Sequence, residues 1–164
     1  MKRKSFFLLF FVFQLMILHG FTQPKKTMSI VDFLSIPSVS SGALSNDGQK
    51  CIYLLSASDW KENKQVGHIW RKELLTNQLI QLTNGVKGES NPLWSPDGKQ
   101  ILFTAKREGA EEIQAYLINN EGGEAKQFTK HTTAVRSAEW APDGQSIYFL
   151  ASEPKTKDEE KKIN

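Results

Sequence analysis

Short apolar runs separated by polar turns return three times along the chain, each time around an Asp-Gly pair. The three stretches align without gaps and read LSNDGQKCIY from residue 44, WSPDGKQILF from residue 94 and WAPDGQSIYF from residue 140. Their aspartates lie 50 residues apart (47 to 97) and then 46 residues apart (97 to 143). Periods of this length are typical of solenoids, propellers and repeat arrays. The pattern therefore predicts a chain built from repeated units.

Each Asp-Gly pair predicts a tight turn between two antiparallel strands. In Ser95-Pro96-Asp97-Gly98, proline fixes φ at the second turn position and glycine accepts the positive φ that follows. A turn of this kind with a glycine bulge joins the two strands of a hairpin. The runs 101–103 and 147–150 that follow are β-branched and aromatic, which is typical of strands buried on both faces.

Two further strands are predicted after each hairpin. In the first unit they span 68–74 and 79–83, and in the second unit they span 113–118 and 125–129. With the strand before each Asp-Gly turn, a unit has four short antiparallel strands, as a propeller blade has. A β-sandwich also has short strands at regular spacing, but it would not repeat one turn motif in every unit. We therefore predict an all-β fold, an incomplete β-propeller of four-stranded antiparallel blades.

The third unit is predicted to stop after its second strand. A charged loop, 153–164, follows in the place that the loop 59–64 occupies in the first unit. The propeller part, 44–152, then holds about two and a half blades, whereas closed propellers have roughly 4–8. We expect the sequence to be the front of a longer protein, which supplies the remaining blades in cis, or a truncated relative. Open sheet edges also allow self-association, so several copies completing a ring is a further possibility.

The beginning of the chain predicts an export signal. After three basic residues, positions 6–18 are apolar except for Gln14, and small residues suited to cleavage follow. Thirteen residues are fewer than the roughly 20 that a membrane-crossing helix needs. We predict a cleaved signal peptide at 1–22, no stable membrane anchor, and a periplasmic or secreted chain. A lead-in with a short helix, 23–43, is expected to follow it.

Composition narrows the chemistry once the signal is set aside. The 164 residues carry 21 Lys and Arg against 18 Asp and Glu, a formal charge of +3. Because Lys2, Arg3 and Lys4 lie in the predicted signal, the rest is balanced, and bulk charge gives no reason to expect a nucleic-acid partner. One cysteine excludes an intrachain disulfide and makes a Cys/His zinc cluster implausible. No phosphate-binding glycine loop occurs either, so we expect no metal and no cofactor.

The repeats resemble TolB-type beta-propeller repeats. The resemblance rests on the WSPDGKQILF motif, the Ile-x-x-Tyr-Leu-Ile strand at 113–118, the Glu-Gly-Gly turn and the Gln-Phe-Thr end. Such repeats occur in the TolB protein and in the propeller of prolyl oligopeptidase family serine peptidases. A helix predicted over 28–34 and capped by Ser29, followed by the first blade, is similar to the start of acylaminoacyl-peptidase-like and dipeptidyl-peptidase-like members. The resemblance covers residues 28–152.

The resemblance implies a propeller joined to an α/β-hydrolase domain that cleaves short peptides. In that domain the nucleophile lies in a G-x-S-x-G elbow, and this sequence contains no such motif. No catalytic residue is therefore carried over, and we expect the chain alone to be inactive. It would be the N-terminal propeller part of an exported serine peptidase, with the hydrolase domain encoded beyond it. The alternative is a non-enzymatic TolB-like periplasmic propeller that binds a partner protein.

The aspartates and tryptophans of the repeat are interpreted as structural. Asp47, Asp97 and Asp143 occupy equivalent turns in separate blades, so they are not expected to form a catalytic carboxylate pair. Trp94 and Trp140 hold the same repeat position just before the turn. We expect these indoles to pack blade against blade rather than to serve as a ligand platform.

Four other residues are candidates for chemistry or binding. Cys51 aligns with isoleucines in the other units and is predicted to be a small buried apolar residue. His68 and His131 have no evident nucleophile or metal partner and are predicted to be edge or surface residues. Trp60 stands alone in a charged loop, and it is the best candidate for contact with a partner or another domain.

Overall fold

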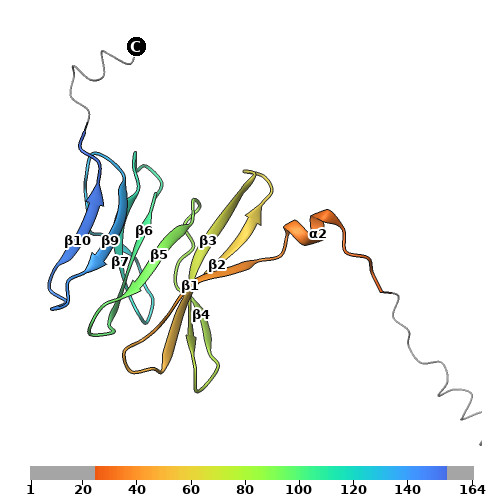
Figure 1. Ribbon diagram of the computed structural model, residues 1–164, viewed down its shortest axis with the longest axis horizontal. Helices are drawn as coiled ribbons and strands as arrows, with labels where there is room; N and C mark the ends of the chain where they lie inside the picture. The colour runs from red at the N-terminus through yellow and green to blue at the C-terminus, as the bar shows by residue number, and fades with distance from the viewer. Residues whose placement is uncertain (1–24, 155–164) are drawn as a thin grey trace, which may run out of the picture. The chain divides into compact units, whose positions relative to one another are not determined.

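A computed structural model of the protein describes residues 25–154, with one short helix and ten strands (Figure 1). The predicted signal peptide, 1–22, lies outside the described residues, as do residues 155–164 of the predicted charged loop. Within residues 25–154 no helix is both long and apolar enough to cross a membrane.

The helix α2 (Ile30–Leu34) is short and is capped as the sequence predicts. The Ser29 hydroxyl oxygen accepts a hydrogen bond from the Asp32 backbone N–H at 3.1 Å, and the Asp32 carboxylate accepts one from the Ser29 N–H at 2.9 Å. This reciprocal pair satisfies two backbone donors at the helix start. The hydrogen bond from the Ser29 N–H and, to a smaller extent, the one from the Ser29 hydroxyl lower the pKa of Asp32. None of the helix residues is buried.

The strands form three antiparallel sheets. The first sheet has the order β1 (Ser38–Leu44), β2 (Lys50–Asp59), β3 (Lys64–Glu73), β4 (Leu79–Gln81). The second repeats it as β5 (Glu89–Trp94), β6 (Gln100–Ala105), β7 (Gln114–Asn119), β8 (Lys126–Gln127). The third consists of β9 (Val135–Trp140) and β10 (Ile147–Ala151). The predicted all-β fold of four-stranded blades is confirmed, and the array is open rather than closed.

Two differences from the predicted boundaries change the first blade. The first blade begins with β1 at Ser38 rather than at residue 44, because the strand before the turn pairs with β2 over its whole length except at a bulge between Ser40 and Ala43. The pairing of β2 with β3 continues out to Asp59 and Lys64, so residues 64–67 are strand rather than loop. The first blade therefore carries a longer hairpin than the second.

The Asp-Gly turns follow the predicted chemistry. Gly48, Gly98 and Gly144 have φ values of 68°, 69° and 68°, which glycine adopts without strain. In the first two turns a serine hydroxyl donates to the aspartate, and the aspartate also accepts a backbone N–H two residues later. These hydrogen bonds, that of the serine first, lower the pKa of Asp47 and Asp97. The aspartates stabilise turns in separate blades, as predicted.

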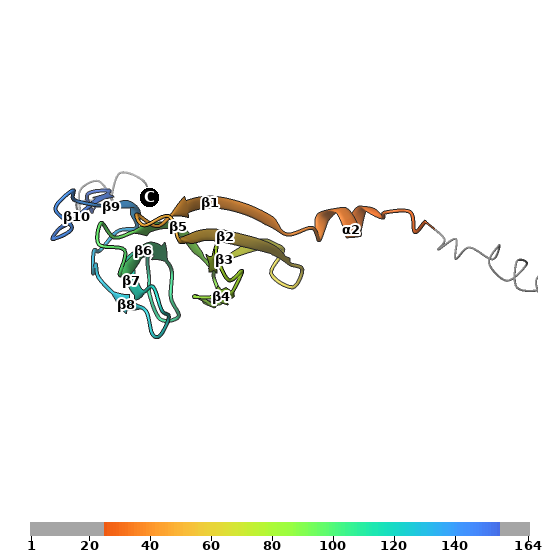
Figure 2. The ribbon, with the colours of Figure 1, turned by 90° about the horizontal axis from the view of Figure 1, so that it is seen from below.

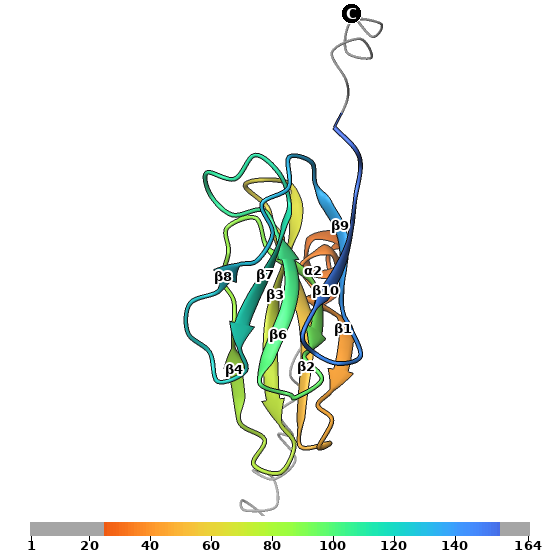
Figure 3. The ribbon, with the colours of Figure 1, turned by 90° about the vertical axis from the view of Figure 1, so that its left-hand side faces the viewer.

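The three blades pack face to face in chain order. The first strands β1, β5 and β9 lie along one side of the array, and the last strands β4 and β8 lie along the other (Figures 2 and 3). One apolar cluster joins the first two blades, with Ile52 and Ile69 from the first and Ile101 and Phe103 from the second. A smaller cluster around Leu102 and Val135 joins the second and third blades. The core of the molecule is thus divided between two blade junctions.

Candidate functional site between the first two blades

A buried carboxylate lies where the first two blades meet. Glu89 opens β5, and its side chain has no exposed surface. Its oxygens accept hydrogen bonds from the Thr83 hydroxyl at 2.6 Å and from the Gly85 backbone N–H at 2.9 Å. The Nδ1 atom of His68, on β3, lies 3.0 Å from the same carboxylate. A buried charge needs this many partners because it has lost its water.

Arg107 completes the cluster and connects it to the surface. Its guanidinium lies 3.5 Å from Glu89, and 30% of its side chain is exposed. The same guanidinium lies over two aromatic rings, 5.9 Å from the centre of Phe103 and 5.5 Å from that of Tyr116. Burial raises the pKa of Tyr116, and the Arg107 charge opposes that shift. One carboxylate and two rings thus hold the arginine at the edge of the junction.

Arg107 and Tyr116 together line two surface hollows. The larger, of about 460 Å³, is also lined by Glu108, Glu112, Lys130 and His131. The smaller, of about 270 Å³, is also lined by Leu82, Ile118 and Ala125. Acidic and basic side chains both line the larger hollow.

The cluster pairs a histidine with a carboxylate but lacks the other groups that hydrolysis needs. A histidine whose Nδ1 faces a carboxylate is the arrangement that orients a general base. The one hydroxyl in the cluster belongs to Thr83, which accepts the Ile69 N–H and donates its only proton to Glu89 rather than to the histidine. Within residues 25–154 no group of three or more His, Cys, Asp or Glu side chains is placed to hold a metal ion. The arrangement can orient charges across the junction, but it supplies no nucleophile.

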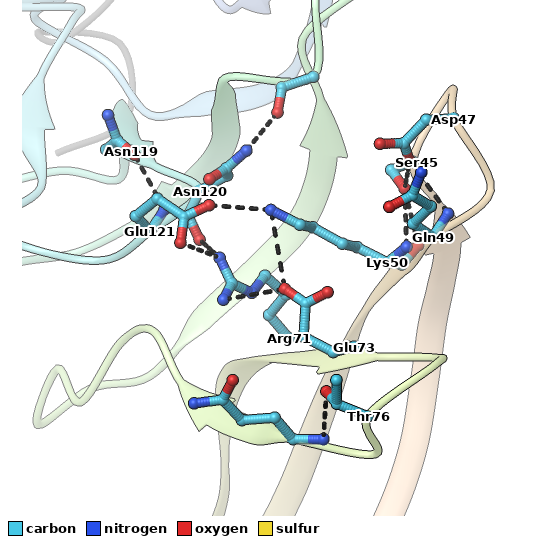
Figure 4. A network of polar contacts seen from close by, with 12 residues as sticks. Ser45, Asp47, Gln49, Lys50, Arg71, Glu73, Thr76, Asn119, Asn120 and Glu121 are labelled. Carbon is cyan, nitrogen blue, oxygen red and sulfur yellow. Dashed lines mark hydrogen bonds and ion pairs between the residues drawn. The ribbon is translucent and has the colours of Figure 1, made fainter.

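A second charged cluster lies at the other end of the same junction (Figure 4). Arg71, whose side chain is 3% exposed, lies 3.2 Å from Glu73 on its own strand and 3.2 Å from Glu121 of the second blade. Its guanidinium also donates to the Asn120 carbonyl. Lys50 reaches Glu121 at 2.8 Å. We call these five residues the Arg71 clamp. Hydrogen bonds from Lys50 and then from Arg71 lower the pKa of Glu121.

The structure places the two histidines more deeply in the junctions than the sequence predicts. His68 is half-buried against Glu89 rather than a free edge residue. His131 lies in the connection from β8 to β9, where its backbone N–H and carbonyl both bond to Gln114 and its ring meets Phe149 edge-on. Sequence reasoning missed Glu89 and Arg107 altogether. The signal for Glu89 was a charged residue at the repeat position where the next blade has Val135.

The repeated tryptophans pack between blades, as predicted. Trp94 packs against the first apolar cluster, and its indole N–H donates to the Ala43 carbonyl of the first blade at 3.1 Å. Trp140 packs against the second cluster, where its buried indole N–H has no partner within the described part of the chain. The prediction for Cys51 is wrong in degree, because its side chain is only partly buried. It lies on the face of the first blade that no other blade covers within residues 25–154.

Trp60 occupies the tip of the long β2–β3 hairpin and is 54% exposed. The preceding Asp59 carboxylate accepts the backbone N–H groups of Lys61 and Glu62, and Asn63 adopts a positive φ of 48°. These features give the loop a defined shape. The indole lines a hollow of about 280 Å³. Contact with a partner or another domain stays a prediction.

Comparison with known proteins connects the fold to two kinds of protein. Residues 26–159 match the family described as the TolB beta propeller domain. An uncharacterized peptidase from Bacillus subtilis, YuxL, is 34% identical over 128 residues, which are 78% of this chain and 19% of that protein. A solved acylaminoacyl peptidase from Pyrococcus horikoshii superimposes with a TM-score of 0.61 at 21% identity, over 77% of this chain and 19% of that one. A putative TolB from Agrobacterium tumefaciens superimposes with a TM-score of 0.55 at 20% identity, over 73% of this chain and 41% of that one. The chain thus spans about a fifth of the length of the peptidases that it matches.

Proposed function

Since the chain belongs to the TolB beta propeller domain family, we propose that it is the N-terminal propeller part of an exported serine peptidase that acts on short peptides. In this proposal the remaining blades and the catalytic hydrolase domain are encoded beyond Asn164. The propeller restricts entry to small peptides and helps to position them.

The observation that carries the proposal is the unequal coverage of the match to a peptidase. A relative named as a peptidase is 34% identical over 78% of this chain, yet the match takes up only 19% of that relative. The matched part is thus a propeller segment inside a much larger enzyme. The Glu89 cluster is compatible with this role, because the Arg107 that it holds lines two surface hollows.

The test compares the 164-residue chain with the product of the whole reading frame that contains it. Both are exported from an expression host, purified, and treated with a fluorophosphonate probe that labels activated serines. We expect the long product to be labelled and to hydrolyse short chromogenic peptides, and the 164-residue chain to do neither. The matched control replaces the serine of the G-x-S-x-G elbow in the long product by alanine, which should abolish both signals.

A second candidate is a non-enzymatic TolB-like propeller that binds a partner protein. It is favoured by the similarity to a putative TolB, which the chain covers over 41% of its length. This candidate predicts that the reading frame ends after the propeller closes and that no serine is labelled. That result would contradict the peptidase proposal and support the TolB-like one.

A further inference from the structure

The connection between β4 and β5 contains the only Asn-Gly pair of the sequence, Asn84-Gly85. Asparagine is one of the labile residues of proteins, and a following glycine favours its breakdown because no side chain shields the next backbone nitrogen. Asn84 is exposed, so its amide can turn toward that nitrogen. The connection joins the first two blades, each of which has all four strands within the described residues.

The packing of the junction requires glycine at position 85. A Cβ added there would collide with a carboxylate oxygen of Glu89 and lie 3.2 Å from the Arg107 guanidinium. Glu89 is not free to move aside, because its side chain is fully buried and accepts the Thr83 hydroxyl at 2.6 Å. The close approach that excludes a side chain also brings the Gly85 backbone N–H to the Glu89 carboxylate, at 2.9 Å. The junction thus keeps a labile pair at this position.

The Glu89 carboxylate is placed to act as a general base on the Gly85 nitrogen. A general base must lie within hydrogen-bond distance of the proton that it removes, and 2.9 Å meets this condition. An adjacent base of this kind activates a weak nucleophile. The side-chain amide of Asn84, one residue away, is a neutral electrophile. The loop therefore brings together an electrophile, a nucleophile and a base.

The Asp-Gly turns of the repeat do not have this combination. In the first two turns the glycine N–H donates to a serine carbonyl at 2.9 Å, not to a carboxylate. The serine hydroxyl and a backbone N–H hold the aspartate side chain in place. These hydrogen bonds, that of the hydroxyl first, lower the pKa of Asp47 and Asp97, so both are ionised at neutral pH. An ionised carboxylate is a poor electrophile, whereas the amide of Asn84 is not ionised.

We propose that Asn84 is a site of spontaneous deamidation, with the Gly85 nitrogen as nucleophile and Glu89 as general base. The Gly85 nitrogen forms a bond to the Asn84 Cγ atom while its proton passes to Glu89. The Cγ–Nδ2 bond then breaks, and its nitrogen leaves as ammonia with the proton that Glu89 returns. Water opens the resulting succinimide at one of its two carbonyls, which gives aspartate or isoaspartate at position 84. The reaction consumes only water, and nothing is oxidised or reduced.

The product weakens the first blade junction. Asn84 and Arg107 together line two hollows, of about 270 and 410 Å³, so the new carboxylate forms close to the Glu89 cluster. Isoaspartate also adds one carbon to the backbone between residues 84 and 85, which moves the Gly85 N–H away from Glu89. The buried Glu89 then has one hydrogen bond fewer, and an unsatisfied buried acceptor is destabilising.

The experiment follows the ageing of the folded 164-residue chain at neutral pH. Samples taken over several weeks are digested, and mass spectrometry measures the aspartate and isoaspartate formed at each asparagine. The internal control is Asn77, which is exposed in the turn between β3 and β4 but is followed by glutamine. Glu89→Gln keeps an oxygen that can accept the Gly85 N–H but removes the base. Asn84→Gln keeps an amide but has to close a larger ring. Circular dichroism checks that each variant is folded.

We expect Asn84 to be modified at least about tenfold faster in the wild type than in Glu89→Gln, because a general base contributes about 10²–10⁴-fold. The wild type unfolded in guanidinium chloride should also react more slowly than the folded chain, and this arm decides the proposal if Glu89→Gln does not fold. Asn77 and the Asn84→Gln variant should stay unmodified over the same period. Modification of Asn84 no faster than that of Asn77, equal rates with and without Glu89, or a faster reaction in guanidinium chloride would each overturn the proposal. The last result would show that Glu89 protects the loop.

Urea denaturation of the aged samples tests the effect on the junction. We expect the urea midpoint of the aged wild type to fall further than that of fresh Asn84→Asp, which adds the charge without lengthening the backbone. Aged Asn84→Gln should keep its midpoint. A modified wild type with an unchanged midpoint would overturn the link to the junction. None of these results depends on the proposed peptidase, which is tested by serine labelling of a different product.

Discussion

The two blade junctions share one backbone design but hold it together with different chemistry. In the first junction Thr83 accepts the Ile69 backbone N–H, and in the second Thr129 accepts the Ala115 N–H in the same way, both at 2.9 Å. Beside these threonines the two junctions differ in their polar side chains. The first has a buried Glu89 with a histidine and an arginine, whereas the second has the neutral side chain of Gln114.

In the second junction the single amide of Gln114 supplies the hydrogen-bond partners that several charged groups supply in the first. Its oxygen accepts the Thr129 hydroxyl at 2.8 Å and the His131 backbone N–H at 2.9 Å, and its nitrogen donates to the His131 carbonyl at 2.9 Å. At the other end of the junctions a neutral residue again replaces a charged one, because Leu117 of the second blade occupies the position of Arg71 in the first. The blade stack therefore requires satisfied partners at these positions, but it does not require charge.

The largest expected effect comes from removing the buried carboxylate. Glu89→Ala leaves the Thr83 hydroxyl, the Gly85 N–H and the Arg107 guanidinium without their acceptor in the junction. Breaking a buried charge pair by deleting one partner costs about 3–5 kcal/mol. We expect the free energy of unfolding, measured by urea denaturation, to fall by about that amount.

The matched variant in the second junction is Gln114→Ala. It also removes a buried acceptor, but the partners it leaves are neutral, so we expect a loss of about 1–3 kcal/mol. Denaturation of the two variants side by side measures the comparison directly. Equal losses for Glu89→Ala and Gln114→Ala would contradict the view that charge makes the first junction the more sensitive one.

Much of the fold could be predicted from the sequence because its turns are local. The Ser-x-Asp-Gly turn needs only its own residues, since the serine hydroxyl, the aspartate and the positive φ of Gly98 lie within four positions. The order of strands then follows from short connections, which keep sequential strands adjacent. These local causes explain why the repeats and the blade architecture were predicted correctly.

The candidate site could not be predicted in the same way, because it joins residues that are distant in the chain. His68, Glu89 and Arg107 come into contact only once the first two blades pack, and no short sequence motif indicates them. The exposure of Cys51 was also missed for a non-local reason. Its counterpart Ile101 is fully buried by the preceding blade, whereas in the described part of the chain no blade covers the face on which Cys51 lies. A sequence repeat shows which face is apolar, but not whether a neighbour covers it.

A smaller effect is expected at the Arg71 clamp, where the second junction suggests the substitution. Arg71→Leu copies Leu117, keeps apolar volume in the junction, and leaves Lys50 to neutralise Glu121. Glu73 and Glu121 each keep Lys50 as a partner and are 22% and 65% exposed, so we expect a loss of about 1 kcal/mol or less. Arg71→Ala removes the packing as well and should cost about 2–4 kcal/mol. If urea denaturation gave Arg71→Leu a loss as large as that of Arg71→Ala, the charge of Arg71 rather than its volume would stabilise this end.

The smallest expected effect is on the exposed member of the clamp and depends on pH. Hydrogen bonds from Lys50 and then Arg71 lower the pKa of Glu121 below its ordinary value of 4.5. A lowered pKa in the folded state means that the ionised Glu121 stabilises the fold above its unfolded pKa, and that this contribution is lost as pH falls through the folded value. Glu121 is 65% exposed, so we expect Glu121→Gln to cost less than about 1 kcal/mol at pH 7. Urea denaturation at a series of pH values should show this difference shrinking below about pH 4.5, while the neighbouring Glu124→Gln shows no such trend. A difference that grew on acidification would have the wrong sign for an ion pair, and the clamp would then owe its stability to the burial of Arg71 alone.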